Sequence, residues 1–231
     1  AFQSLKPRVS YGVTGRSDFD AYQSTPTYSA NGAYLMDGQW ITGYAPSSNT
    51  NSLLGWEKSK AFNIGIDFEA LSSRLRGSIE YFDRRSEDLL YTYTAPQPPY
   101  VWDNILVNVG TTKNTGVEIA LSYDVLARTE LKWTTGINWS YGTTKFSKLS
   151  NDIYKASYID LYQKPGVGTN EYFFRIQEGG KVGQFWGYEY AGHDDNGNML
   201  VYNKDGEAVL TTNVDASDKQ YIGNGAPNHF L

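Results

Sequence analysis

Five segments of this sequence alternate between apolar and polar side chains, and this alternation limits the chain to folds built from long β-strands. In the clearest segment, LKWTTGINWSYG, the aromatic and aliphatic residues fall at odd positions and most polar residues at even positions. Side chains along a strand point to opposite faces in turn, so each segment has one apolar face and one polar face. The segments are residues 5–15, 60–69, 74–83, 116–124 and 131–142.

One face of these segments avoids charge. Every second residue is uncharged over 5–13, 62–68, 75–81, 117–123 and 131–141, whereas Arg, Lys, Glu and Asp occur at the positions between them. We therefore predict a charge-free face that continues across all five strands. An antiparallel sheet that packs one side on a protein core shows the same alternation, so alternation alone leaves two environments open, a core and a lipid bilayer.

The lengths of the segments favour the bilayer. Each has about 9–12 residues, compared with a mode of about 5–6 in soluble sheets and the 9–11 or so of a tilted membrane strand. The predicted connections alternate between hairpin-sized and long, whereas an ordinary sandwich has turns at more even spacing. Outer-membrane barrels combine short periplasmic turns with long extracellular loops. The short connections are 70–73 and 125–130, and the long ones are 16–58, 84–115 and 142–231.

Aromatic residues lie near the ends of the predicted strands. The eight steps from Trp133 to Tyr141 span roughly 21 Å at about 3.4 Å per residue and a tilt of about 40°, close to the 25 Å or so between aromatic girdles. The predicted lipid-facing girdle residues are Tyr11, Tyr81, Tyr123, Trp133, Trp139 and Tyr141. The predicted lumen-facing residues on the polar side are Asp67, Arg76, Glu80, Glu118, Lys132 and Asn138.

Five strands cannot close a barrel, and a membrane sheet tolerates no unpaired edge. We therefore expect the chain to be part of a larger transmembrane antiparallel β-barrel. For the hairpin around 70–73 we predict a pairing of Asp67 with Arg76, of Asn63 with Glu80 and of Phe68 with Leu75.

Composition restricts the remaining functions. The chain of 231 residues is 15% aromatic, with 19 Tyr and 23 Gly, which is typical of an all-β protein with many turns. It contains no Cys, which excludes disulfides and thiolate metal sites. Its net charge is -5 and no basic cluster stands out along the sequence, so we predict no nucleic-acid partner.

No catalytic or metal site is predicted. Neither His193 nor His229 has an activated Ser as a partner. Glu80 and Glu118 could imitate a glycosidase pair, but we interpret them as lumen wall. In DDNGN (194–198) the calcium-loop positions for Gly and Glu are occupied by Met199 and Asp205, which favours a hairpin turn. We predict no cofactor.

Aromatic residues in the long connections are the remaining binding candidates. An exposed Trp or Tyr ring can stack on a sugar or contact a lid protein; the alternative is that these rings only pack the loops together. The candidates are Trp40, Tyr91, Tyr93, Tyr100, Trp102 and Trp186, with Phe185 beside the last.

Several sequence blocks follow one another in a fixed order. They are SYGVTG (10–15), LLGWEKSKAFNIGIDF (53–68), GSIEYFDRRSEDLLY (77–91), NVGTTKNTGVEIAL (108–121) and RIQEGGKVGQFWGYEYAG (175–192). Together they resemble the C-terminal part of the barrel of SusC/RagA-type TonB-dependent outer-membrane transporters. A later block, YIGNGAPNHF, differs from that family's usual Ile-Gly-Asn-Pro-x-Pro pattern by Gly225 and Ala226 before Pro227.

The resemblance implies a 22-stranded barrel in the bacterial outer membrane that imports an oligosaccharide or a peptide. It also implies a SusD-like surface lipoprotein over the extracellular mouth, and a TonB complex acting on an N-terminal box. Residues 1–231 would then supply about five barrel strands and extracellular loops, with the plug domain and TonB box outside this chain. The alternatives are a soluble all-β carbohydrate-binding module and an all-β glycoside hydrolase domain.

Overall fold

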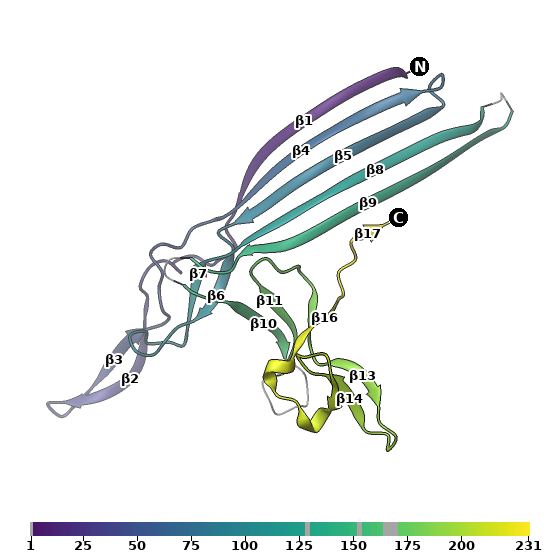
Figure 1. Ribbon diagram of the computed structural model, residues 1–231. Helices are drawn as coiled ribbons and strands as arrows, with labels where there is room; N and C mark the ends of the chain where they lie inside the picture. Colours follow the sequence, from purple (N-terminus) through teal and green to yellow (C-terminus); the bar gives the residue numbers. More distant parts are fainter. Residues whose placement is uncertain (1, 128–129, 152–153, 164–170) are drawn as a thin grey trace.

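The computed structural model describes residues 2–127, 130–151, 154–163 and 171–231, and its architecture is all-β and antiparallel. Its main element is a six-stranded sheet of order β1-β4-β5-β8-β9-β17 (Figure 1). The strands of this sheet are β1 (Phe2–Arg16), β4 (Glu57–Ala70), β5 (Leu75–Glu87), β8 (Thr111–Ala127), β9 (Lys132–Lys148) and β17 (His229–Phe230).

The five predicted strands are confirmed as neighbours in chain order, and each is longer than predicted. They contain 13 to 17 residues because pairing continues past the alternating segments into stretches rich in Thr, Lys and Asn. The short β17 adds a sixth neighbour, with His229 opposite Tyr141. β1 and β17 are the two edges of the sheet, so among the described residues the sheet is open and does not close into a barrel.

The predicted register of the β4–β5 hairpin is wrong by two residues. Ala70 pairs with Leu75, and the turn between them contains Leu71, Ser72 and Ser73 at positive φ. Asp67 therefore lies opposite Ser78 and not Arg76. Asn63 lies opposite Phe82, and Phe68 lies opposite Gly77.

The packing of Phe68 explains this register. A Cβ atom at residue 77 would lie 2.6 Å from the Phe68 ring, so the missing side chain of Gly77 provides the space that the ring occupies. Because side chains alternate with a period of two, a shift of two residues leaves every side chain on its predicted face. The face assignment was therefore unaffected by the error.

A β-bulge adjusts the β8–β9 hairpin. The register shifts between Asp124 and Leu126, which places Leu126 opposite Trp133 and on the apolar side of the sheet. β8 therefore continues to Ala127, and the connection is shorter than the predicted 125–130.

The long connections fold into small sheets beyond one end of the six-stranded sheet, and the two short turns lie at the other end (Figure 1). We call these the loop end and the hairpin end. The connections contain the hairpin β2 (Tyr28–Met36) and β3 (Gln39–Pro46), and the hairpin β6 (Leu90–Thr94) and β7 (Asn104–Asn108). The last connection contains β10 (Tyr158–Gln163), β11 (Tyr172–Gln177), β12 (Gln184–Gly187), β13 (Glu189–His193), β14 (Met199–Tyr202), β15 (Ala208–Leu210) and β16 (Gln220–Asn224), with the 3-10 helices η1 (Thr211–Asn213) and η2 (Ala216–Asp218).

The buried core lies in the loops and not against the large sheet. Ala95, Ile105, Val107 and Val109 form the cluster of buried residues, and they belong to the β6–β7 hairpin and its flanks. On the strands of the large sheet, the described residues that are buried are few, chiefly Phe82 and Ala70. In the part of the chain that the structure describes, no helix has the length and apolarity of a membrane span.

Candidate functional site: the two faces of the sheet and the loop aromatics

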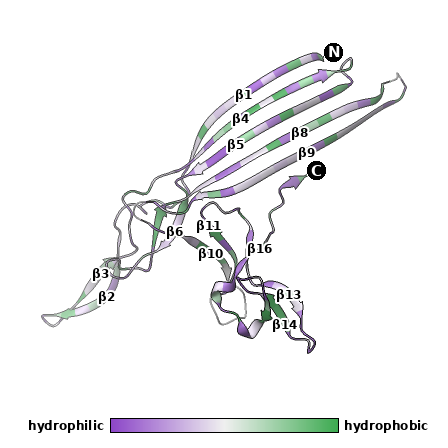
Figure 2. Cartoon of the chain, viewed as in Figure 1, coloured by the Kyte–Doolittle hydropathy of each residue, from purple (hydrophilic) through white to green (hydrophobic). Residues whose placement is uncertain are grey.

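The register joins the apolar sides of five strands into one continuous surface. One cross-strand row, for example, runs through Val9, Ile64, Tyr81, Val117 and Tyr141. Four of these side chains are among the exposed large apolar residues of the chain. Alternating apolar and polar colours along each strand show the same pattern (Figure 2). Soluble monomers rarely expose apolar patches larger than a few hundred Å², so this face requires an apolar partner.

The six predicted girdle residues all lie on this face, at two levels. Tyr11, Tyr81, Trp139 and Tyr141 lie towards the loop end, within one or two rows of each other. Tyr123, opposite Leu75, and Trp133, opposite Leu126, lie towards the hairpin end. Their contact with lipid remains a prediction.

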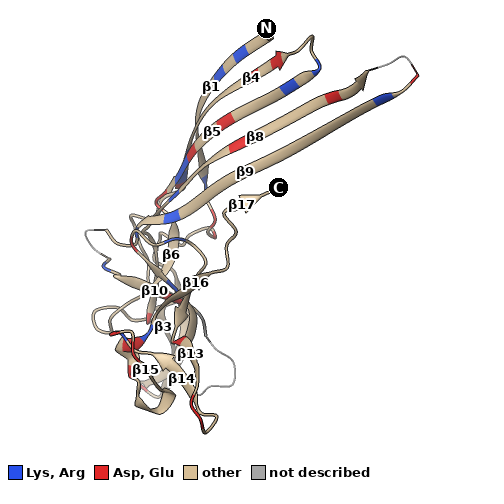
Figure 3. Cartoon of the chain, turned by 45° about the vertical axis from the view of Figure 1, so that its right-hand side comes forward, with Lys and Arg blue, Asp and Glu red and all other residues tan. Residues whose placement is uncertain are grey.

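The charge-free face is shorter than predicted. Lys60 and Asp83 fall inside the predicted segments, and the register places them on the apolar side, beyond Phe62 on β4 and Tyr81 on β5. The prediction of an uncharged face is therefore correct for the middle of the strands and wrong at the loop end. β9 shows this in Figure 3, where charge is confined to its two ends.

The opposite, polar face holds ion pairs that cross strands. Arg8 contacts Glu80 at 2.7 Å and Asp67 at 3.3 Å, which links β1, β4 and β5. Arg76 lies 2.6 Å from Asp124, whose carboxylate also accepts a hydrogen bond from the Thr134 hydroxyl. These groups are partly exposed, so each pair contributes at most about 1 kcal/mol. Their presence identifies a face that meets water or polar groups.

The remaining predicted lumen residues lie on the same polar face. Glu118 is directly opposite Glu80, Asn138 is opposite Ala120, and Lys132 is opposite Ala127. Two carboxylates in directly opposed positions repel each other, and Arg8 offsets this by its ion pair with Glu80. A carboxylate held in this ion pair is poorly suited to be the proton donor of a glycosidase.

Three of the predicted loop aromatics pack the loops together. Tyr91, Tyr93 and Tyr100 all contact the buried cluster of the β6–β7 hairpin, as does Tyr154. The Tyr93 and Tyr154 ring centroids are 5.2 Å apart, and the Tyr93 hydroxyl donates a hydrogen bond to the Lys155 carbonyl. Burial raises the pKa of Tyr91 and of Tyr154. For these rings the structure favours a packing role.

Trp40 and Trp102 retain exposed surface. Trp40 lies near the tip of the β2–β3 hairpin and is 74% exposed, whereas Trp102 is 42% exposed. The indole N–H of Trp102 donates to the Pro46 carbonyl, and the Asn49 side-chain amide donates to the carbonyls of Trp102 and Asn104. The position of Trp102 is therefore fixed between two loops while part of its ring stays accessible.

Trp186 belongs to a stacked column that the sequence did not predict. The Arg175 guanidinium lies 3.7 Å from the Tyr158 ring centroid and 4.2 Å from that of Trp186. It also forms a two-point ion pair with Asp160, at 2.7 and 2.8 Å, which raises the pKa of Arg175. The Tyr221 and Trp186 ring centroids are 4.9 Å apart. No spacing along the sequence would have revealed Arg175 on β11, because its partners come from two other strands, β10 and β12.

The turn-rich segments contain hairpins, as predicted. The Asp194 carboxylate accepts hydrogen bonds from the backbone N–H of Asn196 and Asn198 and from the Asn198 side chain, and these bonds lower the pKa of Asp194. His193 is hydrogen-bonded to the Tyr190 hydroxyl, and His229 packs on Trp139 and Tyr141. Among the described residues, no group of three or more His, Asp or Glu side chains is placed to hold a metal ion.

Comparisons with known proteins agree with this geometry. Residues 1–228 match the family model described as TonB dependent receptor-like, beta-barrel. TonB-dependent receptor P39 of Formosa agariphila is 30% identical over 223 residues, which is 96% of this chain and 20% of that protein. TonB-dependent receptor SusC of Bacteroides thetaiotaomicron is 26% identical over 224 residues, 93% of this chain and 22% of SusC.

Solved structures give the same result. The structure of the RagAB peptide transporter is similar over 99% of this chain and 24% of that chain, with 26% identity and a TM-score of 0.74. The RagAB peptide importer in its open-open state is 25% identical with a TM-score of 0.77, again over 99% of this chain and 24% of that chain. These matches confirm the resemblance predicted from the sequence blocks. The chain spans about a fifth of the length of the curated relatives it matches.

Proposed function

Because the chain belongs to the TonB-dependent receptor-like β-barrel family, we propose that its six paired strands form part of the wall of a 22-stranded outer-membrane barrel that imports an oligosaccharide or a peptide. The relatives and structural neighbours place this chain with SusC/RagA-type receptors. The missing strands, the plug and the TonB box belong to the rest of the receptor.

The opposite character of the two sheet faces is the observation that carries this proposal. One face is uncharged over the middle of five strands, and the other holds the Arg8 and Arg76 ion pairs. A transmembrane barrel wall needs this arrangement, with lipid on one side and a watery, plugged lumen on the other. The unpaired edges of β1 and β17 also require neighbouring strands, since an open edge is not tolerated in a bilayer.

The loops support a role at the extracellular mouth. In an outer-membrane barrel the long connections face outward. Trp40 and Trp102 are the predicted tryptophans that stay exposed there, so we propose them as contacts for substrate or for a SusD-like lipoprotein. One structural neighbour is described as a peptide transporter, which keeps peptide beside oligosaccharide as the proposed cargo. Import would be driven through the TonB complex.

The soluble alternatives are not favoured. A carbohydrate-binding module needs its apolar sheet face covered by a core, whereas here the described core lies in the loops. A glycoside hydrolase needs one carboxylic acid free to donate a proton, whereas Glu80 is held by Arg8. The matched relatives are receptors, which are not enzymes.

Uptake by the full-length receptor tests the proposal. Cells that express it with its lipoprotein are given labelled oligosaccharides and labelled peptides, with and without an uncoupler that collapses the proton gradient. We expect the receptor in the outer-membrane fraction and energy-dependent uptake of one of the two classes. A receptor found in the soluble fraction, or uptake that the uncoupler leaves unchanged, would contradict the proposal.

A further inference from the structure

A row of cations crosses the apolar side of the sheet at its loop end. In the strand register, Lys60 on β4 lies directly opposite Arg85 on β5, Arg85 lies opposite Lys113 on β8, and Lys113 lies opposite Lys145 on β9. Directly opposed residues lie on the same face of a sheet, and neighbouring strands are about 4.8 Å apart. The four side chains therefore form one line roughly 15 Å long. We call these four residues the basic row.

The row is electrostatically unfavourable in isolation. Like charges in directly opposed positions destabilise a sheet, and here three successive pairs are all cationic. The edge of the sheet adds another cation, because an isolated bridge pairs Lys145 with Lys181. An arrangement of this kind needs anions nearby.

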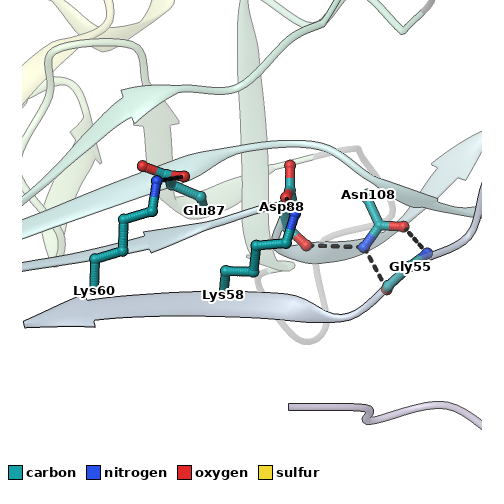
Figure 4. A network of polar contacts seen from close by, with 6 residues as sticks. All are labelled: Gly55, Lys58, Lys60, Glu87, Asp88 and Asn108. Atoms are coloured by element: carbon teal, nitrogen blue, oxygen red, sulfur yellow. Dashed lines mark hydrogen bonds and ion pairs between the residues drawn. The ribbon is translucent and has the colours of Figure 1, made fainter. Parts of the chain in front are cut away.

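The anions of the chain itself neutralise one side of the row more than the other. Glu87 lies 2.6 Å from Lys60, and Asp83 lies 3.3 Å from Arg85 and 3.1 Å from Lys113. Figure 4 shows Lys60 with Glu87, beside a second pair of Lys58 with Asp88. Lys145, which is exposed, has no ion pair with any residue that the structure describes. The uncompensated charge therefore lies at the β8–β9 side.

The position of the row specifies the kind of anion. Lys60 lies two residues beyond Phe62, the last apolar residue of its face on β4, and Lys145 lies four residues beyond Tyr141 on β9. At about 3.4 Å per residue, the cations begin roughly 7–14 Å above the apolar band along the strands. An anion bound here would have apolar surface directly below it.

We propose that the basic row binds the phosphate groups of a phosphorylated glycolipid in the outer leaflet. This inference rests on the proposed function, because it takes the charge-free face as the lipid-facing side and the loop end as the outer side. The ammonium groups of Lys113 and Lys145 and the guanidinium of Arg85 bind phosphate oxygens, while the acyl chains cover the apolar band. Arginine and lysine both suit phosphate, arginine as a two-point donor and lysine as a compact charge. A free anion would use only the cations and none of the apolar surface.

The test uses the full-length receptor purified from outer membranes in mild detergent. Bound glycolipid is counted by native mass spectrometry, and stripped receptor is titrated with the phosphorylated glycolipid, its dephosphorylated form and inorganic phosphate. The variant is the double substitution Lys113→Gln and Lys145→Gln. The control, Lys204→Gln, removes one positive charge from an exposed hairpin away from the basic row.

We expect the double variant to bind the phosphorylated glycolipid about tenfold more weakly, because each cation near an anionic membrane surface contributes favourably. The Lys204→Gln control binds like the unchanged receptor, and Lys145→Arg in place of Lys145→Gln restores part of the affinity. Equal binding of the dephosphorylated lipid, or equal binding by the double variant, would overturn the inference. Competition by inorganic phosphate at equal concentration would also overturn it, in favour of a free-anion site.

Failure of this inference is distinguishable from failure of the proposed function. Outer-membrane location and uptake are measured on the same variants. A receptor that inserts and transports normally, but whose glycolipid content does not depend on Lys113 and Lys145, contradicts the lipid site alone. Absence of the unchanged receptor from the outer membrane contradicts the proposed function itself.

Discussion

Substitution of Ile137 by Arg distinguishes a lipid-facing wall from a soluble sheet. Ile137 lies midway between Trp133 and Tyr141 on β9, pairs with Leu121, and is 50% exposed in this chain. It is four residue steps from Trp133 and four from Tyr141, which is about 10 Å in height on each side for a tilted strand. It would therefore lie near the bilayer midplane, where an Arg on the lipid face costs about 2–4 kcal/mol.

A soluble sheet predicts a much smaller effect. Surface substitutions at a half-exposed position usually change stability by about 0.5 kcal/mol or less. The neighbouring Asn138 is on the polar face, opposite Ala120, so Asn138→Arg adds the same charge one residue away on the other side. Its expected cost in a barrel is well under that of Ile137→Arg. Ile137→Leu retains the apolar character and should be close to neutral.

The free energy of unfolding is measured on the full-length receptor refolded into lipid bilayers and titrated with urea. We expect the midpoint to fall clearly for Ile137→Arg and little for Asn138→Arg or Ile137→Leu. Equal shifts for the two Arg variants would refute the assignment of the faces. A larger shift for Asn138→Arg would place lipid on the opposite side.

Three further predictions concern other parts of the chain. Gly116→Ala should lower the free energy of unfolding by about 1–3 kcal/mol in the same urea titration, because a Cβ atom there would collide with the Tyr141 carbonyl oxygen and lie 2.5 Å from the Phe82 ring. Gly12→Ala is the control, because a Cβ atom at residue 12 would meet open space. Arg175→Lys keeps the charge but loses the planar contacts with two rings, so proteolysis of the loops should become faster, and unchanged cleavage would contradict the stack. Hydrogen bonds from Asn198 lower the pKa of Asp194, so the ionised carboxylate stabilises the β13–β14 hairpin. This stabilisation is fully present above the ordinary carboxyl pKa of about 3.9 and is lost as pH falls through the lower pKa of the folded state. Hydrogen exchange of the hairpin measured against pH should show this loss, and Asn198→Ala should move the loss to higher pH.

Part of the candidate site could be predicted from local pattern and part could not. The girdle residues fall on one face because the period of two is a property of each strand alone. Whether a loop aromatic is packed or exposed depends on partners from elsewhere in the chain. Tyr93 meets Tyr154, and Trp102 meets Pro46, so the sequence could not separate these rings from the more exposed Trp40.

The sequence by itself determined the strands, their order, their two faces and the family. These follow from side-chain alternation, from the alternation of short and long connections and from blocks of residues in fixed order, none of which requires knowledge of distant contacts. The tertiary structure alone decided which residues face each other. The register of the β4–β5 hairpin depends on the ring of Phe68 filling the space above Gly77, and local alternation is the same for any shift of two. The basic row has the same origin, since Lys60, Arg85, Lys113 and Lys145 are far apart along the chain and become neighbours only when four strands pair.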